Sequence, residues 1–224
     1  FATAPASNIN FAVNYPYEYS QLNPRLATSV YKEGHAPADE PVLVSVDYNA
    51  SGGNKNFPNI SIEGEQSQLG ATYGLAYHRL SNTLFAGSYQ KRHTSYGSAN
   101  STGAIYKMVN PTDNSTSGAS LNVLYGSNIA GNNPHPNGAT DFTRDDASYG
   151  MVGRVGLGDL EISEDGSHLW TINLADRYLY KIPLGSDPYN PVAPASSAAI
   201  SRYPLFNLCD ADNDGSIDGA SDID

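Results

Sequence analysis

A pattern of hairpins that occurs twice in the chain is the strongest constraint on its fold. Most of the second copy lies 85 positions after the first, without a gap, and its last segment lies 74 positions after its counterpart. The difference arises because the loop that contains residues 93–102 is longer in the first copy. Such a repeat predicts one supersecondary unit that the chain builds twice. The aligned residues are Leu75 with Leu160, Leu84 with Leu169, Phe85 with Trp170, Arg92 with Arg177, and residues 105–108 with residues 179–182.

Each copy of the repeat predicts short strands that are joined by turns and loops. The expected strands are 73–79, 83–89, 103–109 and 119–125 in the first copy, and 157–163, 168–174 and 178–184 in the second. A further strand is expected over 41–48, where Val42, Val44 and Val46 share one face. Residues 126–152 and 185–200 are expected to be loops. No segment predicts a helix of three turns.

The composition agrees with an all-β chain. Of the 224 residues, 16% are charged, while 21 Gly, 14 Pro and 16 Tyr favour strands and turns over a helical bundle. A four-stranded antiparallel meander that repeats at this spacing is the blade of a β-propeller. A β-sandwich also has short strands, but it would not repeat one hairpin so closely. We therefore predict a partial β-propeller of four-stranded blades with long loops over residues 41–208, after an irregular segment over residues 1–40.

The charge and the cysteine content limit the binding partners and the cellular location that the chain can have. The net charge of −11 makes nucleic acid and anionic membranes poor partners. No apolar run is long enough to predict a membrane span. Cys209 is the single cysteine, so no disulfide can form within the chain. Because the chain starts at Phe1 without a signal segment, we expect a processed form or a fragment, and the polar, lysine-poor composition favours a secreted surface protein.

The turn of the second hairpin has a recognisable pattern. Ser163, Asp165 and Gly166 are followed by Leu169 and Trp170, so that an Asp-Gly pair lies between two apolar strands. Asp can accept hydrogen bonds from the backbone of the turn, and Gly tolerates a positive φ. The pattern resembles the first hairpin of many propeller blades. It also resembles the Asp-box of sialidases, but Ser167 stands where Gly is expected, and the pattern is weak evidence for an enzyme.

Longer stretches of the chain resemble a known class of module. Residues 66–108 include Leu-Phe-Ala-Gly-Ser-Tyr-Gln-Lys-Arg-His, and residues 152–182 run from Val-Gly-Arg-Val-Gly-Leu-Gly-Asp to Leu-Tyr-Lys-Ile. Both resemble the propeller-like module near the start of large secreted bacterial surface proteins, which often carry Ig-like or SdrD B-type repeats further on. The resemblance implies no catalytic residues. It also implies that the propeller continues, either in the remainder of the same propeller or in a neighbouring chain that supplies strands.

Charged residues at strand ends are candidates for ligand binding, because propellers commonly bind ligands at the ends of their strands. These candidates are Lys91, Arg92, His93, Asp176 and Arg177. The alternative for them is pairing between loops or simple solvation, and it is favoured. An acidic segment with Asp141, Asp145 and Asp146 can hold a cation, although a solvated loop is favoured there. The sequence has no Gly-x-Ser-x-Gly elbow, P-loop or dinucleotide fingerprint.

The strongest chemical pattern lies at residues 209–224. Alternating Asp residues can surround one cation, Gly215 permits a sharp turn, and Ser216 can offer its carbonyl. This acidic loop resembles the calcium loops of thrombospondin type 3 repeats, dockerins and EF-hands, although Ser221 stands where an EF-hand has its bidentate Glu. The alternative is an acidic linker. The predicted Ca²⁺ ligands are Asp210, Asp212, Asp214, Ser216, Asp218 and Asp222.

These observations favour a non-catalytic, calcium-stabilised module of the secreted or cell-surface type. Its expected role is adhesion, assembly or extracellular binding, with a glycan or a protein as ligand. The alternative from another class is a secreted calcium-dependent propeller enzyme, either a hydrolase or a lyase. A deep central pocket with carboxylates and a histidine would favour the enzyme, while a flat face or an open strand edge would favour the binding role.

Overall fold

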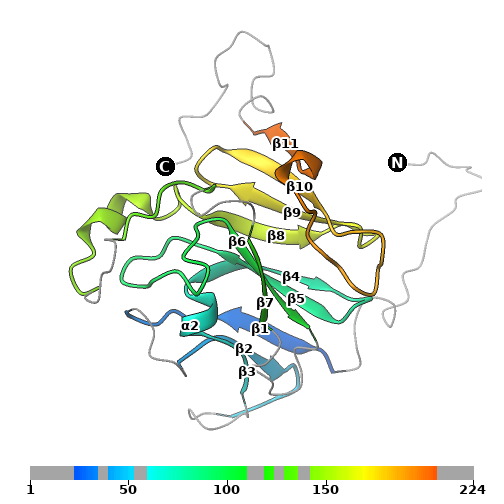
Figure 1. The fold of residues 1–224 in the computed structure, drawn as a ribbon. Coiled ribbons are helices and arrows are strands. Elements are labelled where there is room, and N and C mark those ends of the chain that lie inside the picture. The colour runs from blue at the N-terminus through cyan, green and yellow to red at the C-terminus, as the bar shows by residue number, and fades with distance from the viewer. Residues whose placement is uncertain are drawn as a thin grey trace, which may run out of the picture.

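Three antiparallel sheets follow one another along the chain and form consecutive layers (Figure 1). The structure is a computed structural model and describes residues 23–34, 40–52, 60–109, 119–123, 129–135 and 142–205. The helices among these residues are short: α2 (Gln66–Leu69) and the 3₁₀ turns η2 (Asp146–Met151) and η3 (Ser197–Ala199). The prediction of an all-β chain without a long helix is confirmed for this part of the protein. None of its helices is long and apolar enough to cross a membrane.

The first sheet has the order β1-β2-β3, with β1 at Arg25–Ser29, β2 at Pro41–Asp47 and β3 at Ser61–Glu65. The sequence predicts β2 but assigns residues 1–40 to an irregular segment, and this is wrong for Arg25–Ser29. β1 has only a single large apolar residue, Leu26, so its sequence alone is a weak strand signal. Pairing with β2, from Arg25 opposite Asp47 to Ser29 opposite Leu43, supplies the order that the local pattern lacks.

The second sheet has the order β4-β5-β6-β7 and contains the first copy of the repeat. Its strands are β4 (Thr72–His78), β5 (Thr83–Ser88), β6 (Ala104–Val109) and β7 (Ala119–Val123). The third sheet contains the second copy in β8 (Leu157–Ile162), β9 (His168–Asn173) and β10 (Tyr178–Pro183), and it adds β11 (Ser201–Pro204) beside β10. β11 was not expected, because its four residues carry no period-2 apolar pattern.

The two repeated sheets have the same register in all four strands. Phe85 lies opposite Ala76 and Lys107, and Trp170 lies opposite Glu161 and Lys181. The fourth strands agree as well, since Ser120 of β7 lies opposite Lys107 and Ser201 of β11 lies opposite Lys181. The predicted equivalence of Phe85 with Trp170 is therefore confirmed at the level of strand pairing.

A register irregularity also recurs at the same place in both sheets. The ladder between β4 and β5 shifts between Thr72 and Leu75, and the ladder between β8 and β9 shifts between Leu157 and Leu160. β-Bulges change the twist of a strand and redirect its side chains. The shared shift shows that the two sheets repeat an irregular detail and not only a general strand pattern.

The middle sheet is covered on both faces. One face packs against the first sheet in a core that includes Leu84, Tyr106 and Met108 together with Val42 and Leu43. The opposite face packs against the third sheet. The residues of this second core include Ala76, Phe85 and Ile105 from the middle sheet, and Leu157, Leu160, Leu169, Tyr180 and Ile182 from the third sheet.

The first strands of the two repeated sheets approach each other most closely. β4 and β8 pack together more extensively than any other pair of strands from different sheets. A Cβ atom at Gly74 in β4 would lie 2.5 Å from the carbonyl oxygen of Gly158 in β8. The absent side chain at Gly74 therefore lets the two backbones touch, so that the sheets converge along this pair of strands.

The turn between β8 and β9 is joined to the middle sheet by a buried histidine. The His78 Nε2 atom lies 2.9 Å from the carbonyl oxygen of Gly166, and the Nδ1 atom lies 2.8 Å from Ser81 Oγ. Gly166 has a φ of 73°, and a Cβ atom there would lie 2.8 Å from His78 Nε2. Glycine is therefore required at this position by both its backbone conformation and its neighbour.

We expect Gly166→Ala to destabilise the fold more than Gly153→Ala. Gly153 also has a positive φ of 77°, but a Cβ atom there would meet no other atom within 4 Å, so its replacement carries only the backbone cost of about 1–2 kcal/mol. Gly166→Ala adds the displacement of His78 and the loss of its hydrogen bond, about 1 kcal/mol more. Urea unfolding of both variants measures the difference. Equal losses would show that the His78 contact contributes nothing to stability.

Candidate functional site

The third sheet has one face that no other described sheet covers. Cross-strand partners share a face, so Trp170, Lys181, Ile172, Leu179 and Tyr203 all lie on the side opposite Leu169 and Tyr180. We call these five residues the outer face. Tyr203 is exposed, and the other four are half-buried. The Trp170 and Tyr203 rings lie 6.1 Å apart, and Lys181 Nζ lies 5.4 Å from the centre of the Trp170 ring.

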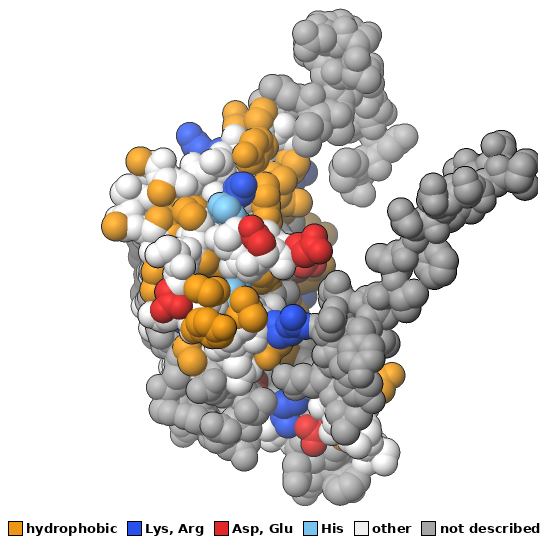
Figure 2. All heavy atoms as spheres, turned by 90° about the vertical axis from the view of Figure 1, so that its right-hand side faces the viewer, with side chains coloured by type: hydrophobic (Ala, Val, Ile, Leu, Met, Phe, Trp, Pro, Cys, Tyr) orange, Lys and Arg blue, Asp and Glu red, His pale blue; other side chains and the backbone are white. Residues whose placement is uncertain are grey.

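The repeat provides a direct comparison for the outer face. Phe85 and Ile105 are the counterparts of Trp170 and Leu179, and they are only 2% and 4% exposed, because the third sheet covers them. The same apolar positions are therefore fully buried in one copy of the repeat and partly open in the other. Figure 2 views the stacked sheets from the right-hand side of Figure 1, at their edges, and shows hydrophobic side chains beside acidic and basic groups there.

The lysine of the repeat has a defined role in the covered copy. Lys107 is the counterpart of Lys181, and its side chain is buried between the two repeated sheets. Its ammonium group donates hydrogen bonds to the Pro191 carbonyl oxygen at 2.6 Å and to Asn190 Oδ1 at 3.3 Å, both in the loop after β10. Burial lowers the pKa of Lys107, because the charged form loses hydration. Lys107 thus links its own sheet to the loop of the next one.

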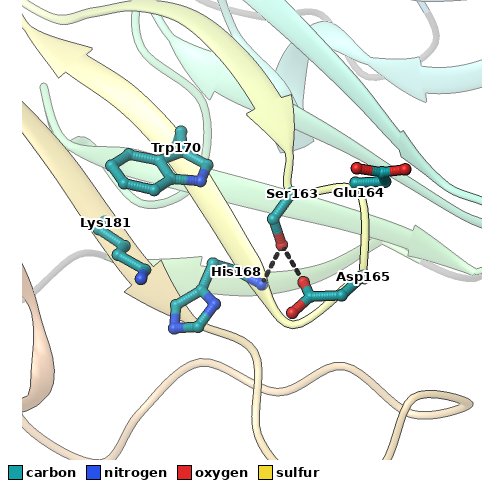
Figure 3. A pocket seen from close by; sticks show the side chains of 6 residues that line it. All are labelled: Ser163, Glu164, Asp165, His168, Trp170 and Lys181. Carbon is teal, nitrogen blue, oxygen red and sulfur yellow. Dashed lines mark hydrogen bonds between the residues drawn. The ribbon is translucent and has the colours of Figure 1, made fainter.

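An open hollow of about 440 Å³ lies where the outer face meets the turn between β8 and β9. Its lining residues are Ser163, Glu164, Asp165, His168, Trp170 and Lys181, and Figure 3 shows the indole and the ammonium group side by side with the turn next to them. The turn is a closed hydrogen-bonded unit. Ser163 Oγ donates to Asp165 Oδ1 at 2.6 Å and accepts from the His168 backbone N–H at 2.9 Å. Sequence analysis identified this turn but not the hollow beside it.

The carboxyl group of Asp165 is held in its ionised form. The Ser163 hydroxyl, the Ser167 hydroxyl and the Ser167 backbone N–H all donate to it, and they hold its pKa well below the usual range. Ser163 donates its proton to Asp165, whose lowered pKa makes the carboxylate a weak base, and the His168 ring contacts Ser167 Oγ instead of Ser163. The hollow therefore offers an aromatic face between fixed charges, and its serine lacks a strong base.

The predicted ligand-binding residues at the end of β5 contact a neighbouring loop. Arg92 Nε donates to the Asp145 carbonyl oxygen at 3.2 Å, and its guanidinium lies 3.4 Å from Asp146. His93 donates its backbone N–H to Asp145 Oδ2 at 2.9 Å. Lys91 Nζ lies 4.8 Å from the centre of the Tyr31 ring. The contacts of Arg92 and His93 with Asp145 and Asp146 are of the kind that sequence analysis favoured, namely pairing between loops.

The other two ligand-binding candidates have different partners. Asp176 accepts hydrogen bonds from the Tyr178 backbone N–H at 3.1 Å and the Tyr180 hydroxyl at 2.6 Å. Arg177 has a positive φ of 60°, and its carbonyl oxygen accepts from the Leu205 backbone N–H. Both residues thus support the turn between β9 and β10. The described contacts do not bring them together with Lys91, Arg92 and His93, and ligand binding at either group stays a prediction.

A buried polar network lies beneath the loop that contacts Arg92 and His93, and sequence analysis missed it. Asp145 was assigned to a solvated loop, but it is 2% exposed and its Oδ2 atom lies 2.9 Å from His135 Nδ1. Ser148 Oγ donates to Asp145 Oδ1 at 2.7 Å. Burial alone would raise the pKa of Asp145, but hydrogen bonds from Ser148 and His93, together with His135, hold it below its usual value.

The network places serine, histidine and aspartate together without forming a catalytic triad. Tyr96 donates to Gln90 Oε1 at 2.7 Å, so the Gln90 amide donates to His135 Nε2 at 3.2 Å. The proton of the neutral ring then lies on Nδ1 and faces Asp145. Ser148 is fully buried, and its hydroxyl lies on this protonated side of the ring. His135 therefore cannot accept the Ser148 proton, and the network is structural.

The predicted calcium ligands, Asp210, Asp212, Asp214, Ser216, Asp218 and Asp222, lie outside the described residues. Cys209 lies outside them as well. Within the described ranges, no group of three or more His, Cys, Asp or Glu side chains is placed to hold a metal ion.

The described part of the chain is thus an all-β protein with two equivalent four-stranded sheets. The chain is similar to Colossin-B from Dictyostelium discoideum, with 28% identity over 192 residues that cover 84% of this chain and 5% of that protein. It thus spans only a small part of the length of this relative. No model of a known protein family matches the chain, and no solved structure matches it.

We expect Asp145→Asn to cost about 1–3 kcal/mol of stability at neutral pH, because it leaves a buried donor of this network without an acceptor. Asn offers one acceptor atom, while both oxygens of Asp145 accept hydrogen bonds. Asp146→Asn is the matched control, because this neighbour is exposed and its pairing with Arg92 is worth at most about 1 kcal/mol. Urea unfolding at pH 7 compares the two variants with the parent.

The same variants test the pH dependence of this pair. Because the folded pKa of Asp145 is lowered, its contribution is fully present above the unfolded value of about 3.9 and is lost as the pH falls through the folded pKa. The difference in stability between the parent and Asp145→Asn should therefore shrink below about pH 4. A difference that stays constant down to pH 2 would contradict the assignment.

Proposed function

We propose that the chain is part of a β-propeller and that its two repeated sheets are successive blades. The observation that carries this proposal is the common register of four strands, including the shared irregularity after Thr72 and Leu157. Two further features support it. The faces stack in the same sense, with the Phe85 side of one sheet against the Leu169 side of the next. The first strands β4 and β8 converge, as the inner strands of blades do around a central axis.

An experimental structure of the chain tests the propeller. Blades in a ring of four to eight are related by a rotation of roughly 45–90° about one axis. We expect the superposition of β4–β7 on β8–β11 to give such a rotation, with the axis near β4 and β8. A superposition dominated by translation along the stacking direction would instead indicate a solenoid.

We propose further that the module is non-catalytic and acts in binding, assembly or adhesion at an extracellular surface. The hydrogen bonds of Ser163 and Ser148 support this, since each hydroxyl donates its proton to an aspartate and not to a histidine ring. The extracellular location rests on composition and on the resemblance to secreted surface proteins. Colossin-B is an amoebal protein, so a bacterial source rests on the resemblance alone.

Hydrolysis assays with glycoside, ester and phosphate substrates test the non-catalytic role. We expect rates equal to the uncatalysed background. Turnover that is abolished by Asp165→Asn, but retained in Asp187→Asn as an exposed acidic control, would favour the secreted enzyme instead.

We propose that Ca²⁺ binds the acidic loop at residues 209–224, with Asp212 and Asp214 among its ligands. This proposal rests on the sequence pattern. We expect a dissociation constant of about 10⁻⁴–10⁻³ M, because the bidentate Glu of EF-hands is missing. Calcium at a hundred times the dissociation constant should stabilise the fold by about 2.7 kcal/mol, provided that the loop forms only in the folded state.

Calorimetry with calcium and with a chelator tests this site. The parent should show binding heat and a higher melting temperature with calcium, while Asp212→Ala combined with Asp214→Ala should show neither. Asp187→Asn removes an acidic residue outside the loop and should behave like the parent. The absence of binding heat in the parent would leave residues 209–224 as an acidic linker.

A further inference from the structure

The outer face has the side-chain chemistry of an interface that is already formed elsewhere in the same molecule. Trp170, Leu179 and Lys181 occupy the positions of Phe85, Ile105 and Lys107. In the first copy of the repeat, the β8–β11 sheet covers these positions and the loop after β10 extends over Lys107. The structure itself therefore shows what kind of surface fits this set of residues.

The lysine gives the clearest sign of an unfilled interface. Lys107 reaches a backbone carbonyl of the following sheet, at Pro191. Lys181 has the same place in the ladder, but its ammonium group lies over the Trp170 ring on its own sheet. A lysine that reaches across to a carbonyl in one copy of the repeat is thus folded back onto an aromatic ring in the other.

We propose that the outer face binds a further four-stranded sheet of the same repeat, supplied by the continuation of a longer polypeptide. In this complex Trp170 and Leu179 are buried, and Lys181 donates a hydrogen bond to a backbone carbonyl in the loop after the third strand of the incoming sheet. The inference rests on the proposed propeller and deepens it, because it names the partner of this face and the residue that fixes it.

A second copy of the chain is a poorer occupant than a further repeat. The surface that covers Phe85 is the Leu169 side of the third sheet, and in each copy this side is already buried against the middle sheet. The corresponding side of the middle sheet, which includes Leu84, is buried against the first sheet. Within the two repeated sheets, a second copy therefore has no free surface of the required kind.

The single tryptophan of the chain reports directly on this face. The probe is an extended chain in which a second copy of residues 142–205 follows Asp224, with phenylalanine in the added copy at the position of Trp170. Residues 142–156 lead into β8, so the added sheet has its own connecting segment. We expect the quenching of Trp170 by acrylamide to fall severalfold relative to the parent, and its emission to move to shorter wavelength.

Two variants of the extended chain test the role of Lys181. Lys181→Met in the original copy should weaken binding of the added sheet by about tenfold or more, since it removes a hydrogen bond from a charged donor. Arg154→Met removes one exposed positive charge from a loop and should leave Trp170 as protected as before. Equal protection in both variants would overturn the role of Lys181.

Two outcomes would overturn the proposed partner. One is a parent chain that dimerises in analytical ultracentrifugation with Trp170 protected, since the occupant is then a second copy. The other is an extended chain in which Trp170 remains as accessible as in the parent. The indole of Trp170 could itself be too large to fit under the added sheet, so a second extended chain carries Trp170→Phe. Hydrogen exchange of the backbone amides of β9 and β10 is compared between this chain and the parent. If these amides gain no protection in the extended chain, the proposal that a further sheet covers the outer face is wrong. The propeller proposal is tested separately, on the parent chain, by the rotation that superposes β4–β7 on β8–β11. The propeller proposal and the proposed partner of the outer face can therefore fail independently of each other.

Discussion

The structure depends on a sheet that has to bury both of its faces. Every residue of β5 is buried, and successive side chains point to opposite sides, so Leu84 packs toward the first sheet and Phe85 toward the third. A slip of one residue would exchange the two sets of side chains and place each in the wrong core. The register of the middle sheet is therefore fixed from two sides, and the third sheet repeats this register although, among the described sheets, only one covers it.

Buried polar contacts add to the apolar cores in fixing how strands, turns and loops are arranged. His78 joins the middle sheet to the turn at Gly166, and Lys107 joins it to the loop at Pro191. In the first sheet, Glu63 is 5% exposed and accepts a hydrogen bond from Ser45, which in turn accepts one from Arg25. Buried polar groups are costly when they lack partners, so these contacts fix one arrangement of the loops among many that the apolar cores alone would allow.

The sequence was sufficient to predict the repeated hairpins, because their apolar alternation and the Asp-Gly turn are local signals. It was not sufficient for β1, β3 and β11, which are short and gain their order from a neighbouring strand. Asp145 was misassigned for a related reason: an aspartate among polar residues is usually solvated, and nothing local shows that His135 lies 2.9 Å away. The alignment of Phe85 with Trp170 was visible in the sequence, but the difference in their burial is a property of the packed layers.

The apolar residues of the outer face favour association with another surface, and Lys181 restricts which surfaces can bind. Burial of a large apolar side chain such as Trp170 or Leu179 contributes about 1.5–3 kcal/mol, so an uncovered face of this kind favours association with any apolar surface. An arbitrary apolar surface would also bury the Lys181 ammonium without an acceptor, which costs several kcal/mol. Without a partner, the ammonium group can remain hydrated over the indole ring, where a cation–π contact is worth about 0.5–1 kcal/mol. A surface that presents both apolar side chains and an acceptor oxygen for the ammonium group gains the apolar burial without this cost, and the loop at Pro191 is an example of such a surface within the same molecule.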